Sequence, residues 1–153
     1  MLKILICLFL LSALSSFATD STTFYDKSGR HKGRSYQNGS STSYYDHTGK
    51  KSGSATVNNN RTIYRNSSGV TTGSSYSHGS NNQTDFYDRS GRKIGSSRQD
   101  NSGTIYRDAS GRMVGRSRQS GSRTYYYDQS GRQIGSSNGS KSDPNMFFDL
   151  LKK

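Results

Sequence analysis

The sequence predicts an all-β protein: a meander of about six repeated antiparallel β-hairpins that forms a roll, ring or solenoid and ends in a short C-terminal helix. Three observations predict this. A unit of roughly twenty residues, marked by tyrosine and glycine, recurs six times after residue 18. Each unit joins a β-prone segment to a turn signature, and Ser-, Asn- and Gly-rich stretches separate the units. The last eleven residues break the pattern and carry a helix-start signature instead.

The N-terminal segment has the three-part plan of a secretory signal peptide. Met1-Leu2-Lys3 is followed by an apolar run over residues 4–14 and by small residues that end at Ala18. This run is too short to span a bilayer as a stable anchor, so we expect cleavage after Ala18, no remaining membrane span, and a secreted or periplasmic protein. A retained N-terminal anchor is the alternative. The predicted organisation is a signal peptide (1–18), a repeat domain (19–142) and a C-terminal capping helix or tail (143–153).

Each repeat unit carries the same order of side chains, which unit four illustrates. Phe86-Tyr87 favours a strand, and the segment from Asp88 to Gly91 favours a turn, because the carboxylate can accept backbone N–H groups two residues on and glycine tolerates positive φ. The turn glycines of successive units are 20, 20, 22, 20 and 20 residues apart. Aligned on their aromatic pairs, units three and five place Tyr64 and Tyr106 one residue further from the turn glycine, which predicts a longer loop there.

The return strand carries a second glycine, and the residue before it differs between units. It is apolar in the last three units and polar or charged in the first three: Lys32, Ser52, Thr72, Ile94, Val114 and Ile134. This predicts a better packed C-terminal half and a looser N-terminal half. A single hairpin is marginally stable in water, so stacking or ring closure between units must supply the stability.

The C-terminal tail is predicted to be a short helix. Asp143-Pro144 suits an N-cap and a first helical residue. The apolar stripe that follows consists of Met146, Phe147, Leu150 and Leu151. We expect this helix to cap the open end of the repeat core, and a docking peptide for a partner is the alternative.

Composition limits the function classes. Only about a fifth of the residues after Ala18 are hydrophobic, and the single cysteine, Cys7, lies in the signal segment, so the mature chain has no disulfide. The formal net charge of +12 falls to +11 when Lys3 is removed with the signal. Such a chain is expected to bind polyanions weakly, and the partners that an exported protein meets are an acidic glycan, lipopolysaccharide or a surface protein rather than a specific nucleic acid. A basic surface that only keeps the chain soluble is the alternative.

The sequence contains no convincing catalytic or metal-binding pattern. His31, His47 and His78 fall in turn or linker positions and recur with no Ser, Asp or Cys partner. The turn Asp residues come once in five of the six units, and no Asp residues have the Asp-x-Asp spacing of calcium loops. We therefore expect no enzymatic activity, no metal and no cofactor.

The recurring basic and aromatic residues are the remaining candidates for binding. A basic residue follows each of five turn glycines, so a regular stack would place these side chains in a row beside the recurring tyrosines, where charge and stacking could hold a polyanion or glycan. Alternatively, the tyrosines form the core and the basic residues only solvate the hairpin tips. The candidate contact residues are Arg30, Lys50, Arg92, Arg112, Arg132, Tyr87, Tyr106 and Tyr127.

The repeat resembles that of small exported bacterial repeat proteins of unknown function, which are akin to the proteins described as five-fold β-flowers. The segment from Thr104 to Gly115, Thr-Ile-Tyr-Arg-Asp-Ala-Ser-Gly-Arg-Met-Val-Gly, carries the resemblance, which is clearest over residues 84–137. It implies a ring or roll of hairpins and no activity. A weaker resemblance is to the YD repeats of the Rhs family, through Tyr-Asp-x-Ser-Gly-Arg. Choline- and glucan-binding repeats are also similar, but they build their pockets from Trp, which this chain lacks.

Two functions follow from these observations. The first is an exported, non-enzymatic repeat protein that binds an acidic surface polymer or an envelope partner. The second is a self-assembling structural protein of the cell surface, in which exposed edge strands pair between copies to form an oligomer.

Overall fold

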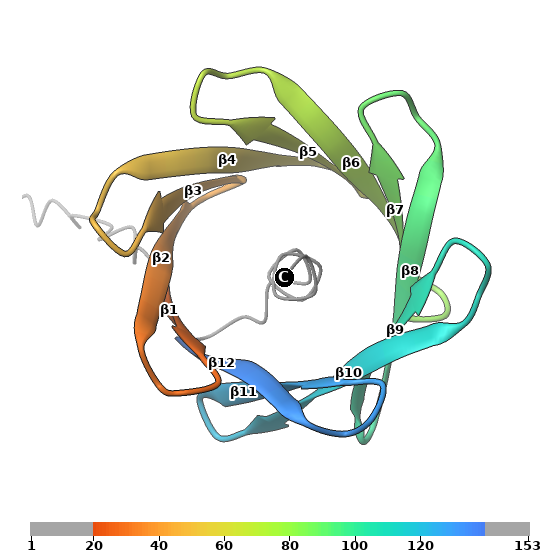
Figure 1. The fold of residues 1–153 in the computed structure, drawn as a ribbon. Coiled ribbons are helices and arrows are strands. Elements are labelled where there is room, and N and C mark those ends of the chain that lie inside the picture. The colour runs from red at the N-terminus through yellow and green to blue at the C-terminus, as the bar shows by residue number, and fades with distance from the viewer. Residues whose placement is uncertain (1–19, 140–153) are drawn as a thin grey trace, which may run out of the picture.

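The chain forms a closed twelve-stranded antiparallel barrel in a computed structural model that describes residues 20–139 (Figure 1). Each strand pairs with its neighbours in sequence, and the first strand pairs with the last, so the repeats form a ring rather than an open solenoid. The predicted signal peptide and the predicted C-terminal helix lie outside the described residues. Within residues 20–139, no helix is long and apolar enough to cross a membrane.

The twelve strands fall into two sets of six. The outgoing strands lead to six turns that we call the Asp-x-Ser-Gly turns, although unit two has Asp-His-Thr-Gly and unit three has Asn-Ser-Ser-Gly there. These strands are β1 (Asp20–Asp26), β3 (Ser41–Asp46), β5 (Arg61–Asn66), β7 (Gln83–Asp88), β9 (Gly103–Asp108) and β11 (Arg123–Asp128). The return strands follow them: β2 (His31–Asn38), β4 (Lys51–Asn58), β6 (Thr71–His78), β8 (Lys93–Asp100), β10 (Met113–Ser120) and β12 (Gln133–Gly139). The predicted meander of about twelve short antiparallel strands is confirmed.

All six hairpin turns have the same length and the same backbone bonds. In unit four the Gly91 N–H donates to the Asp88 carbonyl at 3.1 Å, and the Asp88 N–H donates to the Arg92 carbonyl at 3.0 Å. Gly91 has φ +82°, as expected for a three-residue hairpin loop that ends in a left-handed glycine. The prediction of longer loops in units three and five was wrong: Asn66 and Asp108 stand where Asp88 stands, so Tyr64 and Tyr106 align with the first aromatic position rather than the second.

Every hairpin also carries a β-bulge just after its turn. In unit four Phe86 pairs with Gly95 and Tyr87 with Lys93, which leaves Ile94 as the extra residue. The same shift in the other units leaves out Lys32, Ser52, Thr72, Val114 and Ile134. The position that the sequence analysis treated as part of a regular return strand is therefore a bulge. Bulges increase strand twist and curvature, which helps a sheet to close on itself.

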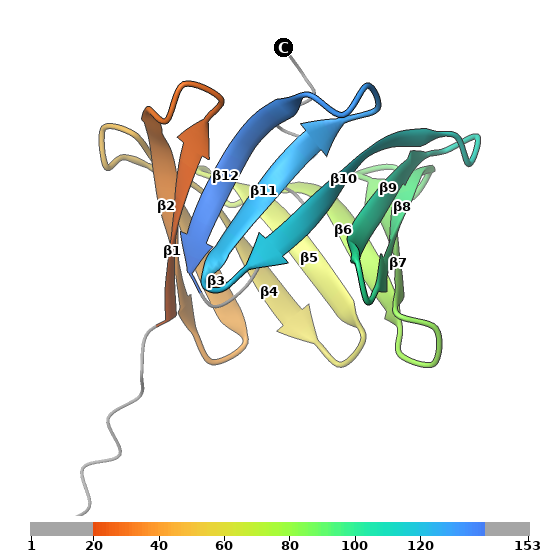
Figure 2. The same ribbon diagram turned by 90° about the horizontal axis from the view of Figure 1, so that it is seen from below.

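One face of the sheet is uncharged over its middle layers and buried in most of the repeats. Its first ring is aromatic and consists of Phe24, Tyr44, Tyr64, Phe86, Tyr106 and Tyr126. Each of these residues lies beside a small buried residue on the preceding return strand, drawn from Ser35, Ala55, Ser75, Ser97, Ser117 and Ser137. The opposite face carries most of the exposed Arg and Lys residues. In a closed barrel only the concave face can be buried all the way round, so the aromatic ring lines the interior. Figure 2 shows the strands inclined to the barrel axis.

Packing inside the barrel is tightest beside the closure. Tyr106 and Tyr126 are 1% and 0% exposed and pack against Val114 and Ile134. Phe24 is also buried, because β1 pairs with β12 and brings it next to this cluster. The aromatic residues of units two and three are only half-buried. The predicted contrast between two halves of the chain is thus corrected: ring closure joins unit one to the well packed units four to six.

Candidate functional site

The recurring turn arginines are paired within their own hairpins. The Nε of Arg92 lies 3.2 Å from Oδ2 of Asp88, and the Arg side chain is 81% exposed. The same ion pair forms in the turns of Arg30, Arg112 and Arg132. In unit two, the Lys50 N–H donates to Asp46 Oδ1 at 3.0 Å. Because all six turns close the same end of the barrel, these residues encircle one rim instead of forming the predicted row.

The turn carboxylates stay ionised at neutral pH. The hydroxyl of Ser90 and the backbone N–H of Arg92 donate to Asp88, and these bonds hold the pKa of that carboxyl below its usual value. At Asp46 and Asp108 the hydroxyls of Thr48 and Ser110, with the turn N–H groups, lower the pKa in the same way. At Asp26 the backbone N–H of Arg30 lowers the pKa, and at Asp128 burial raises the pKa but the bonds from Arg132 and Ser130 outweigh it. Five of the six tips therefore combine an Asp with an Arg or Lys four residues on, and these two charges offset each other. Unit three has the uncharged Asn66 and Val70 instead, and Lys27 and Arg89 add one further positive charge to the tips of units one and four.

The three candidate tyrosines divide between the two faces. Tyr87 and Tyr127 lie on the outer face and are half-buried. Tyr106 lies inside, where its Oη is 3.3 Å from Oγ of Ser117. Its placement among contacts for an external polymer is therefore corrected: this tyrosine is a core residue. The sequence reasoning missed this because it aligned Tyr106 with Tyr127, whereas the register aligns it with Tyr126.

A group of arginines on the outer face of the sheet was not singled out by the sequence analysis. It lies on β8–β11, and among residues 20–139 none of its members forms an ion pair: Arg98, Arg107, Arg116, Arg118 and Arg123. Arg98 and Arg118 share one position of the repeat, three residues after the second glycine, but the other three lie at different positions, so the group as a whole follows no repeat position. Their concentration in units four to six was nevertheless visible in the sequence.

Tyrosine rings hold part of this arginine group. Arg116 Cζ lies 5.7 Å from the centre of the Tyr127 ring, and Arg123 Cζ lies 5.6 Å from that of Tyr25 and 5.9 Å from that of Tyr125. A cation over a ring face is attracted to it but keeps its charge. We call Arg116, Arg118, Arg123, Tyr25, Tyr125 and Tyr127 the Arg–Tyr surface. It crosses the closure, because Tyr25 on β1 and Tyr125 on β11 both pair with Ser136 on β12.

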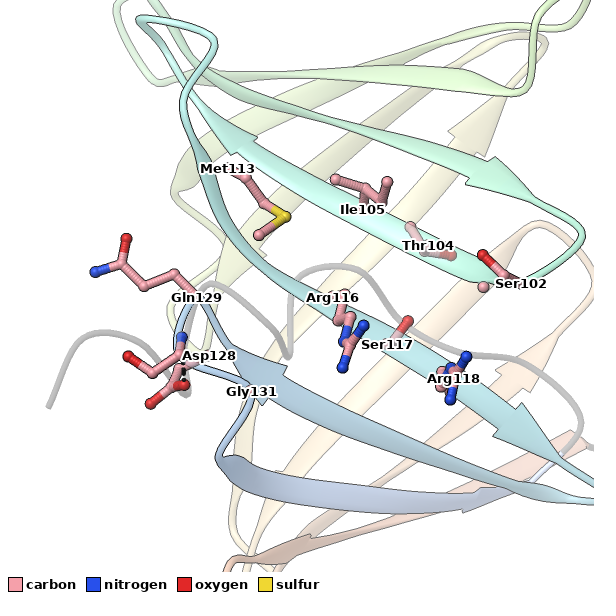
Figure 3. A pocket seen from close by; sticks show the side chains of 12 residues that line it. Ser102, Thr104, Ile105, Met113, Arg116, Ser117, Arg118, Asp128, Gln129 and Gly131 are labelled. Atoms are coloured by element: carbon pink, nitrogen blue, oxygen red, sulfur yellow. Dashed lines mark hydrogen bonds between the residues drawn. The ribbon is translucent and has the colours of Figure 1, made fainter.

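A depression of about 340 Å³ adjoins the Arg–Tyr surface (Figure 3). Arg116 and Arg118 lie along β10 between apolar Ile105 and Met113 on one side and the turn of residues 128–131 on the other. The two arginines beside Ile105 and Met113 suit a ligand that has an anionic group attached to a less polar part, such as the ring of a sugar.

A second polar cluster on the outer face surrounds Asp85. Its carboxylate lies 2.9 Å from Lys93 Nζ, 3.0 Å from Gln83 Nε2 and 3.3 Å from His78 Nε2. Burial by itself raises the pKa of Asp85, but the bonds from Lys93, Gln83 and His78 outweigh it and hold the pKa below its usual value. His78 is therefore a partner of Asp85 and not only a solvated loop residue. No group of three metal-ligating side chains occurs in the part of the chain that the structure describes.

Comparison of the sequence with protein-family models and with curated proteins found no match. The functional inference therefore depends on the geometry of the outer face.

Proposed function

We propose that this is an exported, non-enzymatic protein whose Arg–Tyr surface binds an acidic surface glycan. The observation that supports the proposal is the contrast between two sets of arginines. Those at the turns are paired with Asp, whereas those on β8–β11 have no carboxylate partner among residues 20–139. The first set adds little net charge to the surface, and the second set places five positive charges on four neighbouring strands. Arg34, Arg61 and Arg65 on β2 and β5 also form no ion pair among residues 20–139, but no Arg over a Tyr ring is found there.

Charge attracts the polymer, and the tyrosines give the surface a shape that fits sugars. A local concentration of one sign of charge raises the association rate of an oppositely charged ligand and is screened by salt. Tyr25, Tyr125 and Tyr127 present aromatic bodies with polar ends, which suits the apolar faces and hydroxyl edges of sugar rings. The depression beside Arg116 and Arg118 would take a carboxylate, sulfate or phosphate carried by the chain.

The alternative function, a self-assembling structural protein, loses the mechanism on which it rested. Assembly was expected through exposed edge strands, but every strand between residues 20 and 139 is paired on both sides. Assembly by this route would need the barrel to open first. The binding function is therefore the one that the geometry favours.

The proposal is tested with two matched triple variants. The first carries Arg116→Gln, Arg118→Gln and Arg123→Gln; the second carries Arg92→Gln, Arg112→Gln and Arg132→Gln. Both lose the same formal charge. Binding to an immobilised uronic-acid polysaccharide and to lipopolysaccharide is measured between low and physiological salt. We expect the first variant to lose about tenfold or more of the affinity and the second to lose far less, because only the first removes cations without a carboxylate partner.

The outcomes separate the site from bulk charge. Equal losses in both variants would mean that net charge alone drives binding, and full binding by the first variant would overturn the proposal. Preference for lipopolysaccharide over the polysaccharide would assign the anionic group to a phosphorylated lipid. Circular dichroism of both variants checks that the barrel is intact.

A further inference from the structure

We propose that the depression beside Arg116 and Arg118 binds one acidic sugar that carries an acyl group, either an acetyl ester or an acetamide. This inference rests on the proposed function, because it names the kind of sugar that the Arg–Tyr surface selects within an acidic glycan. Unit five, which contributes β9 and β10, differs from the other repeats at the positions that line this depression (Figure 3).

Unit five alone has arginine at two successive outward positions of its return strand. Arg116 and Arg118 lie two residues apart on β10, so their Cα atoms are about 7 Å apart on the same face of the sheet. At these two positions unit one has only Arg34, unit four has only Arg98, and the other units have no arginine. Two guanidinium groups can donate together to one carboxylate, sulfate or phosphate, and the return strands offer such a pair only here.

Unit five also has an apolar wall beside its arginines. Ile105 pairs with Arg116 across β9 and β10, and Met113 at the turn end of β10 is 39% exposed. The residues that stand in the place of Met113 in the other units are all polar or charged: His31, Lys51, Thr71, Lys93 and Gln133. The apolar surface of Met113 is therefore open to a ligand, and a flexible thioether adapts well to a small apolar group.

A missing side chain makes room for the ligand. Gly103 lines the depression at the position where units four and six carry the long side chains of Gln83 and Arg123. A Cβ at Gly103 would lie 3.4 Å from the Cα of Arg118 and closer still to the carbonyl oxygen of Ser117. The close approach of β10 therefore requires glycine, and the space beside Arg118 stays open.

The polar groups at the turn of residues 128–131 are compatible with such a ligand. Asp128 lines the depression, but Arg132 Nε lies 3.0 Å from its Oδ2 and offsets its charge. Ser90 and Ser110 donate their hydroxyls to the turn Asp at 2.6 Å, whereas the equivalent hydroxyl of Ser130 makes no bond within residues 20–139. It can therefore donate to the carbonyl oxygen of an acyl group.

The size of the depression suits one sugar residue. Its volume of about 340 Å³ is at the lower end of the range of about 300–1,000 Å³ for ligand pockets. With its anionic group at Arg116 and Arg118, a sugar would bring an acyl methyl to Ile105 and Met113. A methyl group that leaves water for an apolar wall is worth about fourfold in affinity, so the acyl group should add a measurable preference to the effect of charge.

Polymers that differ in the acyl group test the inference. Binding of the full chain is measured to O-acetylated polymannuronate and to the same polymer after mild alkaline deacetylation, which keeps every carboxylate. We expect about fourfold tighter binding of the acetylated form if the ligand is an ester. Hyaluronan oligosaccharides carry N-acetyl groups and half as many carboxylates per sugar. Tighter binding of these than of the deacetylated polymer would assign the acyl group to an acetamide, because charge favours the opposite order.

Two charge-neutral double variants locate the preference. Ile105→Thr with Met113→Gln introduces the residues that units one and six have at these places. Ile63→Thr with Thr71→Gln puts the same residues at the equivalent positions of unit three, outside the depression. We expect the first variant to bind acylated and deacetylated polymers alike and the second to keep the preference. Circular dichroism checks that both barrels are intact.

The outcomes separate this inference from the function on which it rests. Equal binding of all three polymers by the unaltered protein, or a preference that the unit-five variant retains, would overturn the acyl site. The proposed function would survive that result if binding still depended on Arg116, Arg118 and Arg123. Absence of binding to all three polymers would overturn both.

Discussion

Each Asp-x-Ser-Gly turn is organised by one side-chain oxygen that accepts bonds from the backbone on both sides of the turn. Asp108 Oδ1 accepts the N–H of Ser110 at 2.9 Å and that of Arg112 at 3.0 Å. Unit three has Asn66 at this place, and its Oδ1 accepts the N–H groups of Ser68 and Val70 at 3.1 and 3.0 Å. Both turns therefore need the side-chain oxygen as a hydrogen-bond acceptor, and the negative charge of Asp is not needed to form the turn.

This comparison predicts how Asp108 variants behave. Asp108→Asn should fold with a Tm close to that of the unaltered protein at pH 7, and Asp108→Ala should lower the Tm further, because it leaves the turn N–H groups without their acceptor.

The pKa of Asp108 is lowered from 3.8 in the folded protein, so its charge stabilises the fold above about pH 4 and ceases to do so as the pH falls through the lowered pKa. Asp108→Asn should therefore lose less stability on acidification. Thermal melts between pH 2 and 7 measure both effects, and identical Asn and Ala melts would contradict this account.

At the scale of strands and hairpins, the inner glycines are as important as the turns. Tyr64 on β5 lies opposite Gly73 on β6, and the missing side chain lets the ring reach Ser75, whose Oγ is 2.9 Å from the Tyr64 Oη. On the other side of β6, a Cβ at Gly73 would lie 2.5 Å from the Tyr87 carbonyl oxygen on β7. The glycine thus allows both a close approach between strands and the packing of an aromatic ring over it.

Gly73→Ala should therefore destabilise the barrel by about 1–3 kcal/mol, because the clash is with backbone atoms that cannot turn away. Gly79→Ala is the matched control: it lies in the loop between β6 and β7, and no atom lies within 4 Å of its added Cβ. Urea unfolding measures both variants. A Gly73→Ala protein as stable as Gly79→Ala would show that the strands move apart without cost.

At the scale of the whole molecule, closure changes what each repeat contributes. In an open stack the end units have one neighbour, whereas here β1 pairs with β12 over residues 22–26 and 135–139 and no described unit is terminal. Closure also assembles the Arg–Tyr surface, since Tyr25 and Arg123 meet across it although they are far apart in sequence.

A cross-strand disulfide tests closure directly. Thr23 and Asn138 pair across β1 and β12, at the Cα separation that a disulfide needs. With Cys7 replaced by serine, Thr23→Cys and Asn138→Cys should oxidise within one chain and raise stability by up to about 4–5 kcal/mol, since the bond closes a loop of more than 100 residues. Non-reducing electrophoresis and thermal melts follow this. The control pair Thr23→Cys and Ser74→Cys, from strands that are not neighbours, should not form a bond, and failure of the first pair to form one would indicate an open structure.

The sequence by itself determined the repeat, its strands and its turns. Those features are local: an Asp or Asn two residues before a Ser-Gly or Thr-Gly pair fixes a turn whatever surrounds it, as the six identical loops show. Local sequence reasoning gave a wrong result where a tyrosine could be aligned with either of the two aromatic positions of the repeat. Tyr64 and Tyr106 fitted either aromatic position, and only the register with the neighbouring strands placed them inside.

The tertiary structure decided which residues share a surface. The turn arginines were predicted from their periodicity, but closure distributes them around a rim and Asp neutralises them. The arginines on β8–β11 share no single position of the repeat, and they become a surface only when antiparallel pairing sets Arg116 beside Tyr127 and Arg118 beside Tyr125. Sequence periodicity reports backbone conformation, which depends on neighbours along the chain. A binding surface depends on neighbours across the sheet, which the pairing register alone brings together.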